Sequence, residues 1–264
     1  MNGRFSRLEV ETRPAQAAEQ LTPAQLGNTV RTSQTDMQAA DEAYRIGRFE
    51  QALQMYTKAL GKNQALTAAW VGQVQMLVEL GEYSEARLWS DKALELFRNN
   101  GDLLAAKARA CLRQGDKTAS MECSDASMQS PGTSPLRWEA RGEVLLPKNA
   151  ARARDCFDKA LADPAADWFD RVVVARVYVF HGRGVLAMEM AQAAVGLRSG
   201  HGYCWYVLGT SQELVGWADQ AATSYRRALD LTPGLAECKG ALRRLENRSL
   251  SQRLWGRLGG MFKR

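Results

Sequence analysis

Small apolar residues recur along this chain with a period close to 34 residues. Six alanines follow one another at intervals of 34, 33, 34, 34 and 34 residues, and a second alanine follows each of them by seven positions. Residues seven apart lie on one face of an α-helix, where small side chains let a neighbouring helix approach closely. The first series is Ala52, Ala86, Ala119, Ala153, Ala187 and Ala221, and the second is Ala59, Ala93, Ala126, Ala160, Ala194 and Ala228.

A turn residue precedes the first alanine of each unit by four or five positions. It is Asn149 in the fourth unit and glycine in the other five. Both residue types tolerate the left-handed conformation in which helices commonly end. The pattern predicts six pairs of helices joined by tight turns, with Tyr56, Phe157 and Tyr225 filling the space between adjacent units. The glycines are Gly47, Gly81, Gly115, Gly182 and Gly216.

The sequence resembles the tetratricopeptide repeat (TPR) family, whose unit is a helix–turn–helix of 34 residues. The sixth unit matches the family pattern in register at Trp205, Leu208, Gly209, Gly216, Ala221, Tyr225, Ala228 and Pro233. The resemblance implies an all-α fold, a right-handed α–α superhelix in which each unit buries its apolar face against the next. It covers residues 33–235 as six units, at about 33–66, 67–100, 101–134, 135–167, 168–201 and 202–235.

The middle of the array departs from the family pattern. The third and fourth units are each one residue short at the turn, and Lys107 and Arg141 replace expected apolar residues. Pro147 predicts an early end to the first helix of the fourth unit, because proline cannot continue a helix. The apolar run 172–180 also fits a β-strand by composition, but its phase with the repeat favours the first helix of the fifth unit.

Three segments lie outside the repeats. Residues 1–32 are predicted to be a polar arm or one extra helix, with a helix start at Thr22 and Pro23, and residues 236–248 a capping helix. In the tail, 249–264, apolar and basic residues separate on a helical projection. Such a segment can dock on protein, including a second copy, lie on an anionic membrane, or stay a solvated terminus. The apolar side has Leu250, Leu254, Trp255, Leu258, Met261 and Phe262, and the basic side has Arg253, Arg257 and Arg264.

The charge distribution limits the choice of partner. The net charge is +6, but the five bases after Glu246 leave residues 1–247 with 30 bases against 29 acids. Nucleic acid is therefore not expected as a partner, because the body offers no basic track for a phosphate backbone. The five cysteines form no CxxC pair, and neither a signal peptide nor a membrane-spanning run is visible. These features predict a cytoplasmic protein, with contact to a membrane through the tail as the alternative.

The sequence gives no sign of catalytic chemistry. There are two histidines and no HExxH, phosphate-binding loop, dinucleotide fingerprint or GxSxG motif. His201 and Cys204 are three apart, but two ligands do not make a metal site. The chain is therefore predicted to be no enzyme and to need no metal or cofactor.

In the TPR family the first helices of successive units line a concave groove, and this resemblance implies the binding residues. A groove with charges in the middle and aromatic residues at one end suits an extended or helical peptide of a partner protein. The implied residues are Met37, Asp41, Tyr44, Arg45 and Gln75 in units one and two, with Val71 and Val78, then Arg109, Arg113, Glu139 and Glu143 in units three and four, and Phe169, Arg176, Phe180, Tyr203, Tyr206 and Glu213 in units five and six, with Val172 and Val179.

Each part of this groove has a structural alternative. Phe180, the valines and the tyrosines fit a role between packed helices. Arg109 and Arg113 could pair with Glu139 and Glu143 in a solvated network that contributes little to stability. Asp41 and Gln75 stand where some family members hold a peptide carboxylate with basic or amide groups, so that clamp is not expected. We predict a non-enzymatic scaffold or adaptor in a larger assembly, or alternatively a peripheral membrane factor anchored by the tail.

Overall fold

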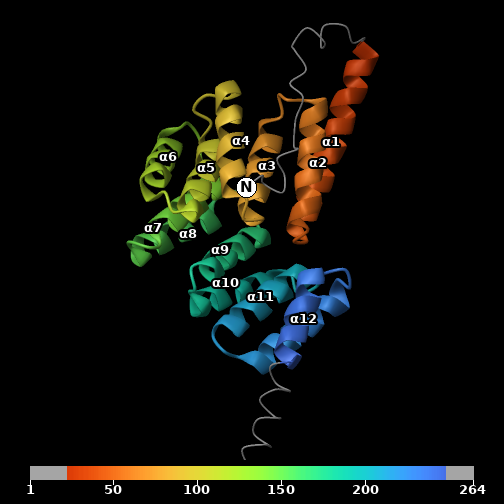
Figure 1. The fold of residues 1–264 in the computed structure, drawn as a ribbon, viewed down its shortest axis with the longest axis vertical. Helices are drawn as coiled ribbons and strands as arrows, with labels where there is room; N and C mark the ends of the chain where they lie inside the picture. Colours follow the sequence, from red (N-terminus) through yellow and green to blue (C-terminus); the bar gives the residue numbers. More distant parts are fainter. Residues whose placement is uncertain (1–22, 248–264) are drawn as a thin grey trace, which may run out of the picture. The chain divides into compact units, whose positions relative to one another are not determined.

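The structure is a computed structural model that describes residues 23–247, with side chains from residue 31 onward. Every regular element within this range is a helix (Figure 1). Residues 236–247 form a last helical segment after α12. The labelled helices are α1 (Pro23–Arg45), α2 (Phe49–Lys62), α3 (Thr67–Glu79), α4 (Tyr83–Leu96), α5 (Gly101–Gln114), α6 (Lys117–Gln129), α7 (Pro135–Leu145), α8 (Ala150–Ala162), α9 (Trp168–Phe180), α10 (Gly184–Leu197), α11 (Gly202–Leu214) and α12 (Ala218–Leu231).

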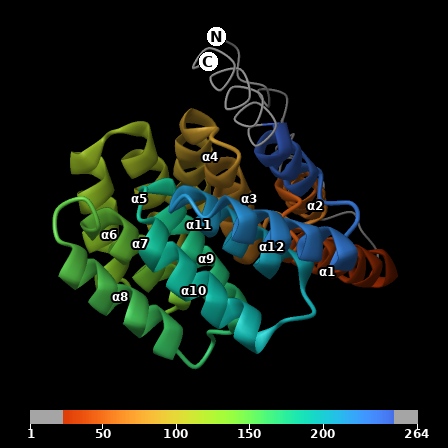
Figure 2. The same ribbon diagram turned by 90° about the horizontal axis from the view of Figure 1, so that it is seen from below.

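The described chain forms two compact units that divide after Ala166. The first unit contains α1 to α8, and the second contains α9 to α12 and the helix 236–247. Within each unit the helices form consecutive pairs, such as α5 with α6 and α11 with α12 (Figure 2). In the first unit α3 also contacts α5, and α5 contacts α7, so the first helices of successive pairs are neighbours.

Helix positions follow the repeat, with one extension. The first helices α3, α5 and α7 begin at Thr67, Gly101 and Pro135, at the 34-residue spacing of the sequence. By contrast, α1 begins at Pro23 and therefore includes ten residues of the segment interpreted as an arm or extra helix. Residues 172–180 lie in α9, which confirms the helix over the strand.

The small-residue positions of the third pair differ from the sequence-based alignment. Ala119 and Ala126 of α6 are only partly buried, whereas Ser120 and Ser127 are buried completely or nearly so. These serines stand 34 residues after Ala86 and Ala93, and a serine side chain is nearly as small as that of alanine. The third unit is therefore in register, and the prediction that it is one residue short is wrong. In the other five pairs both alanines are fully buried.

The one irregular turn joins α7 to α8. Five of the six turns inside the helix pairs place a glycine in the left-handed region, with φ between 68° and 99°. Asn149 instead has a φ of −150° and caps α8, because its side chain accepts a hydrogen bond from the backbone N–H of Arg152. The expectation that it adopts the left-handed conformation is wrong. Pro147 does end the preceding helix early, since α7 has 11 residues where α5 has 14.

The polar residues at normally apolar positions connect adjacent pairs. Lys107 of α5 pairs with Asp91 of α4, and Arg141 of α7 pairs with Asp125 of α6. Each base lies 16 residues after its acid, so the same contact is made at two consecutive interfaces. A charge pair replaces the expected apolar contact at these positions.

Aromatic rings pack directly on helical glycines. Phe157 of α8 lies against Gly142 of α7, and Tyr225 of α12 lies against Gly209 of α11. These two rings therefore fill space inside their own pair. Tyr56 packs on the following pair, at Gly72 of α3, as expected for a residue between units.

We predict that Gly209→Ala destabilises the protein by about 1–3 kcal/mol, because the new Cβ would lie 2.6 Å from the Tyr225 ring and would overpack the interface. Gly196→Ala is the control, since a Cβ added to this helical glycine would meet no atom within 4 Å and alanine favours helix by about 0.8–1 kcal/mol. Thermal and urea unfolding followed by circular dichroism measure both. Equal effects of the two substitutions would contradict the close packing.

Candidate functional site

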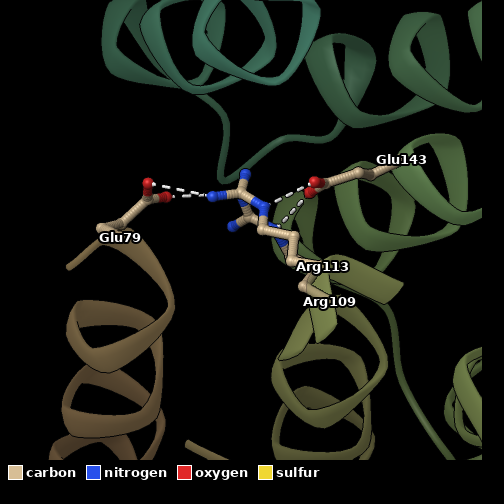
Figure 3. Close-up of polar contacts among 4 residues, drawn as sticks. All are labelled: Glu79, Arg109, Arg113 and Glu143. Atoms are coloured by element: carbon tan, nitrogen blue, oxygen red, sulfur yellow. Dashed lines mark hydrogen bonds and ion pairs between the residues drawn. The ribbon is translucent and has the colours of Figure 1, made fainter. Parts of the chain in front are cut away.

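Four charged side chains from three consecutive first helices meet in the first unit. The guanidinium groups of Arg109 and Arg113, both from α5, lie between the carboxylates of Glu79 from α3 and Glu143 from α7 (Figure 3). Nε of Arg109 donates to Glu143 Oε2 at 2.6 Å, and Nε of Arg113 donates to Glu143 Oε1 at 2.7 Å. On the other side, Arg109 Nη2 is 3.3 Å and Arg113 Nη1 is 3.5 Å from the two oxygens of Glu79. We call these four residues the buried charge cluster.

The buried charge cluster is closed to water. Its side chains are between 0% and 4% exposed. Burial disfavours the charged form of Arg109, but the carboxylates of Glu143 and Glu79 outweigh burial and raise the pKa of Arg109 above its ordinary value. Removing one member of such a cluster leaves an uncompensated charge in a medium of low dielectric, which is strongly destabilising. The cluster therefore fixes the spacing of α3, α5 and α7.

The repeat itself brings these charges together. Arg109 and Glu143 are 34 residues apart and occupy equivalent positions in α5 and α7, and Glu79 and Arg113 are 34 apart in α3 and α5. Equivalent residues of neighbouring first helices face each other, so opposite charges at one repeat position form a pair across the interface. This register is the signal that could have identified Glu79, which was absent from the sequence-based site.

Burial changes the role of the predicted central groove charges. The sequence allowed Arg109 and Arg113 to pair with Glu139 and Glu143 in a solvated network. The structure differs in two respects. The arginines pair with Glu143 and Glu79, and the network is buried. Glu139 is itself buried one turn before Glu143 and adds to the negative field at Arg109. Groups with so little exposure position the helices and leave little surface for a partner.

The predicted residues of the first two pairs stay more accessible. Asp41 is exposed, and its carboxylate accepts a hydrogen bond from the Tyr56 hydroxyl at 2.6 Å. Tyr44 is half-buried against Phe49, with ring centroids 6.0 Å apart. Met37, Arg45, Val71 and Gln75 are also half-buried, whereas Val78 belongs to the core.

In the second unit most of the aromatic residues that were predicted to line one end of the groove are buried or half-buried. Tyr203 is buried and stacks on half-buried Tyr206 at 5.7 Å, and Tyr206 lies 5.9 Å from Tyr225. Burial raises the pKa of Tyr206. The Tyr225 hydroxyl donates to Glu213 at 2.8 Å, and the guanidinium of Arg176 lies 6.0 Å from the centre of the Tyr203 ring.

The other residues predicted at this end of the groove differ in how far they are exposed to solvent. Val172 is buried, as the alternative of a core role predicts, and Val179 is half-buried. Phe169, expected to line the groove, is also buried. Phe180 is exposed at the end of α9, edge-on to the ring of His181, so the alternative that it packs between helices is wrong. The tail residues 249–264, with every docking residue predicted there, lie outside the described residues.

Two thiols in the first unit interact with each other. A hydrogen bond with Cys111 of α5 lowers the pKa of Cys123 of α6 to about 7, and nearby Lys107 acts in the same direction against the effect of burial. Burial raises the pKa of Cys204 to about 12 and that of Cys238 to about 11. Cys123 is also the only one of the five cysteines that is not buried.

Neither a metal centre nor a membrane span is found within residues 23–247. No cluster of three or more histidine, cysteine, aspartate or glutamate side chains there could hold a metal ion. Over the same residues, none of the helices combines the length and apolar character needed to cross a membrane.

We predict that Arg109→Met lowers the free energy of unfolding by about 3–5 kcal/mol, because it leaves the buried carboxylates of the charge cluster short of one positive partner. Lys107→Met in the same helix is the control, since the Lys107–Asp91 pair is partly exposed and its loss should change stability by about 1 kcal/mol or less. Urea unfolding measures the difference. A similar cost for the two variants would show that the cluster does not hold the helices.

We predict that iodoacetamide modifies Cys123 before the other cysteines at pH 7, because about half of this thiol is ionised there. Its rate should rise with pH through about 7 and then level off. The rate at pH 7 should fall in Cys111→Ala, which removes the hydrogen bond that stabilises the thiolate. Mass spectrometry of the modified peptides measures these rates, and equal reactivity of Cys123 and Cys204 would contradict the assignment.

Comparison with known proteins adds structural relatives only. No protein-family model and no curated protein matches the sequence. Among solved structures, a tetratricopeptide repeat protein from Parabacteroides merdae matches with a TM-score of 0.54 and 15% identity over 87% of this chain and 88% of its own. The TPR protein TTC0263 from Thermus thermophilus has a TM-score of 0.48 and 15% identity, over 81% of this chain and 98% of its own.

A longer relative is the Cut9–Hcn1 hetero-tetramer of the APC/C, with a TM-score of 0.49 and 15% identity over 81% of this chain. The present chain spans 42% of that relative's length. The likeness to the P. merdae protein agrees with the paired helices and with their 34-residue register. This chain therefore has the tetratricopeptide repeat fold.

Proposed function

We propose that this protein is a non-enzymatic interaction scaffold that holds a segment of a partner protein along the first helices of its first unit. The observation that carries the proposal is the buried charge cluster, which fixes α3, α5 and α7 side by side. A surface whose helices are held rigidly loses little conformational entropy when a partner binds.

The accessible side chains suggest the chemistry of the partner segment. Tyr44 and Met37 expose part of their apolar surface on α1, next to the charged groups of Asp41 and Arg45. Gln75 of α3 adds an amide that can donate and accept hydrogen bonds. These groups suit an extended or helical peptide with an apolar anchor and an acidic group for Arg45.

The charged residues support binding without chemistry. The strongest electrostatic feature of the described chain is the buried charge cluster, and its members are engaged with each other away from solvent. A substrate could not reach these groups without separating the helices that they hold together. Their arrangement is therefore better suited to supporting a binding surface than to acting on a substrate.

The test is affinity purification with the full-length chain as bait, followed by quantitative mass spectrometry. We expect Arg45→Glu/Gln75→Glu to reduce recovery of the main partner at least tenfold, because it removes the base that would meet an acidic group of the partner and makes the surface around Tyr44 strongly negative. The matched control is Arg98→Glu/Gln51→Glu, which makes the same charge change at exposed positions on a loop and on α2.

The proposal requires the two variants to differ. Circular dichroism first establishes that both are folded like the parent protein. Recovery that is unchanged in Arg45→Glu/Gln75→Glu, or lost equally in both variants, would contradict binding along the first helices.

A further inference from the structure

One edge of the second unit exposes large apolar side chains. Phe180 ends α9 and Val185 lies in the first turn of α10, while Leu214 ends α11 and Trp217 precedes α12. They are 46%, 67%, 44% and 46% exposed, respectively. We call these four residues the turn edge.

The two turns that carry these residues are in contact. A Cβ built on Gly184 would lie 2.6 Å from Cγ1 of Val215 and 3.1 Å from Cγ of Leu214. The turn between α9 and α10 therefore lies against the turn between α11 and α12. Of the large apolar residues that are exposed among residues 31–247, four lie at this edge and the other three are Leu88, Leu96 and Leu197. Large apolar side chains that stay exposed close to one another often mark an interaction site.

The described chain ends with a helix that packs on α12. Four residues separate α12 from the helix 236–247. The Cys238 thiol lies 3.2 Å from the carbonyl oxygen of Tyr225, and Glu246 pairs with Arg226 at 3.6 Å. Both contacts are made in the middle of α12, eight and nine residues after Trp217. Nine helical residues span about 14 Å, so the described chain ends on α12 at a moderate distance from the turn edge.

The following residues are long enough to reach the turn edge. The 14 residues of α12 span about 21 Å, at 1.5 Å per helical residue. The 17 residues 248–264 span about 25 Å as a helix and about 56 Å when extended. In either conformation the segment is long enough to reach the turn edge of the same molecule.

The tail also complements the edge chemically. Its apolar side carries Leu254, Trp255 and Leu258, which can cover an apolar surface. Residues 180–189 and 213–219 contain three acids, Glu189, Glu213 and Asp219, against the single base Arg183. The tail from residue 248 has five bases and no acid. Attraction between opposite charges therefore favours the same placement as apolar burial.

We propose that residues 249–264 fold back and cover the turn edge of their own molecule. Leu254, Trp255 and Leu258 pack against Phe180, Leu214 and Trp217, and the arginines stay at the rim near the acids. This contact lies in the second unit and goes beyond the proposed function, which concerns the first helices of the first unit.

Hydrogen–deuterium exchange of the full-length chain tests the proposal. We expect peptides covering 180–189 and 213–219 to exchange at least threefold faster in Leu254→Glu/Leu258→Glu than in the parent protein, because charges on the apolar side of the tail release it from the edge. The matched control is Gln252→Glu/Gly256→Glu, which adds the same charge off the apolar side and should leave exchange unchanged within twofold. A third variant, Trp217→Asp, should release the tail and speed exchange of peptides covering 249–264.

Three results would overturn the proposal. Equal exchange at the turn edge in parent, Leu254→Glu/Leu258→Glu and control would show that the tail does not cover it. Protection that grows with protein concentration, together with a dimer by light scattering, would assign the edge to a second copy. Protection that depends on added phosphatidylglycerol vesicles would assign it to a membrane. None of these results affects the test of the first-helix surface, because Arg45 and Gln75 belong to the other unit.

Discussion

Two buried arginines that lie between two buried glutamates hold the first unit's inner helices in place. Charges in such surroundings are tolerated only when every one has its counterion. Because Glu79, Arg109 and Glu143 come from α3, α5 and α7, the cluster is complete only when the three helices keep one spacing and one register. Of the accessible side chains proposed to bind a partner, Gln75 lies on α3, one of these helices, whereas Tyr44 and Arg45 lie on α1, which packs on α2 and contacts α3.

The cluster in turn depends on close packing at the small residues. Fully buried alanines let the helices of each pair approach, and in α6 serines at positions 120 and 127 do the same. Identical steps of 34 residues then bring equivalent positions of successive first helices face to face. Opposite charges at one position pair across the interface, as Arg109 and Glu143 do. Lys107 and Arg141 instead pair with acids of the preceding second helices, each 16 residues earlier, and the two pairs are themselves one repeat apart.

Periodicity alone predicted the helical class, the paired helices and most of the turns, because small side chains and glycines act locally. The sequence could not show which polar residues are buried. Arg109 and Glu143 look like groove residues until packing closes them to solvent, and Glu79 is noticed only when charges are compared one repeat apart. The sequence predicted a left-handed turn at Asn149, whereas this residue caps α8. Asparagine is favoured both at helix N-caps and in left-handed turns, so its presence does not distinguish the two. The turn edge also needed the structure, since contact between two turns has no local signal.

A double-mutant cycle on Arg109 and Glu143 measures whether the buried charge cluster holds the first helices together. Urea unfolding of Arg109→Met, Glu143→Leu and the combined variant gives the coupling between the two side chains. We predict that the combined variant is more stable than the sum of the single effects by at least about 2 kcal/mol, because it removes both charges together. Single effects that add to within about 0.5 kcal/mol would contradict a buried charge cluster that sets the spacing of the helices.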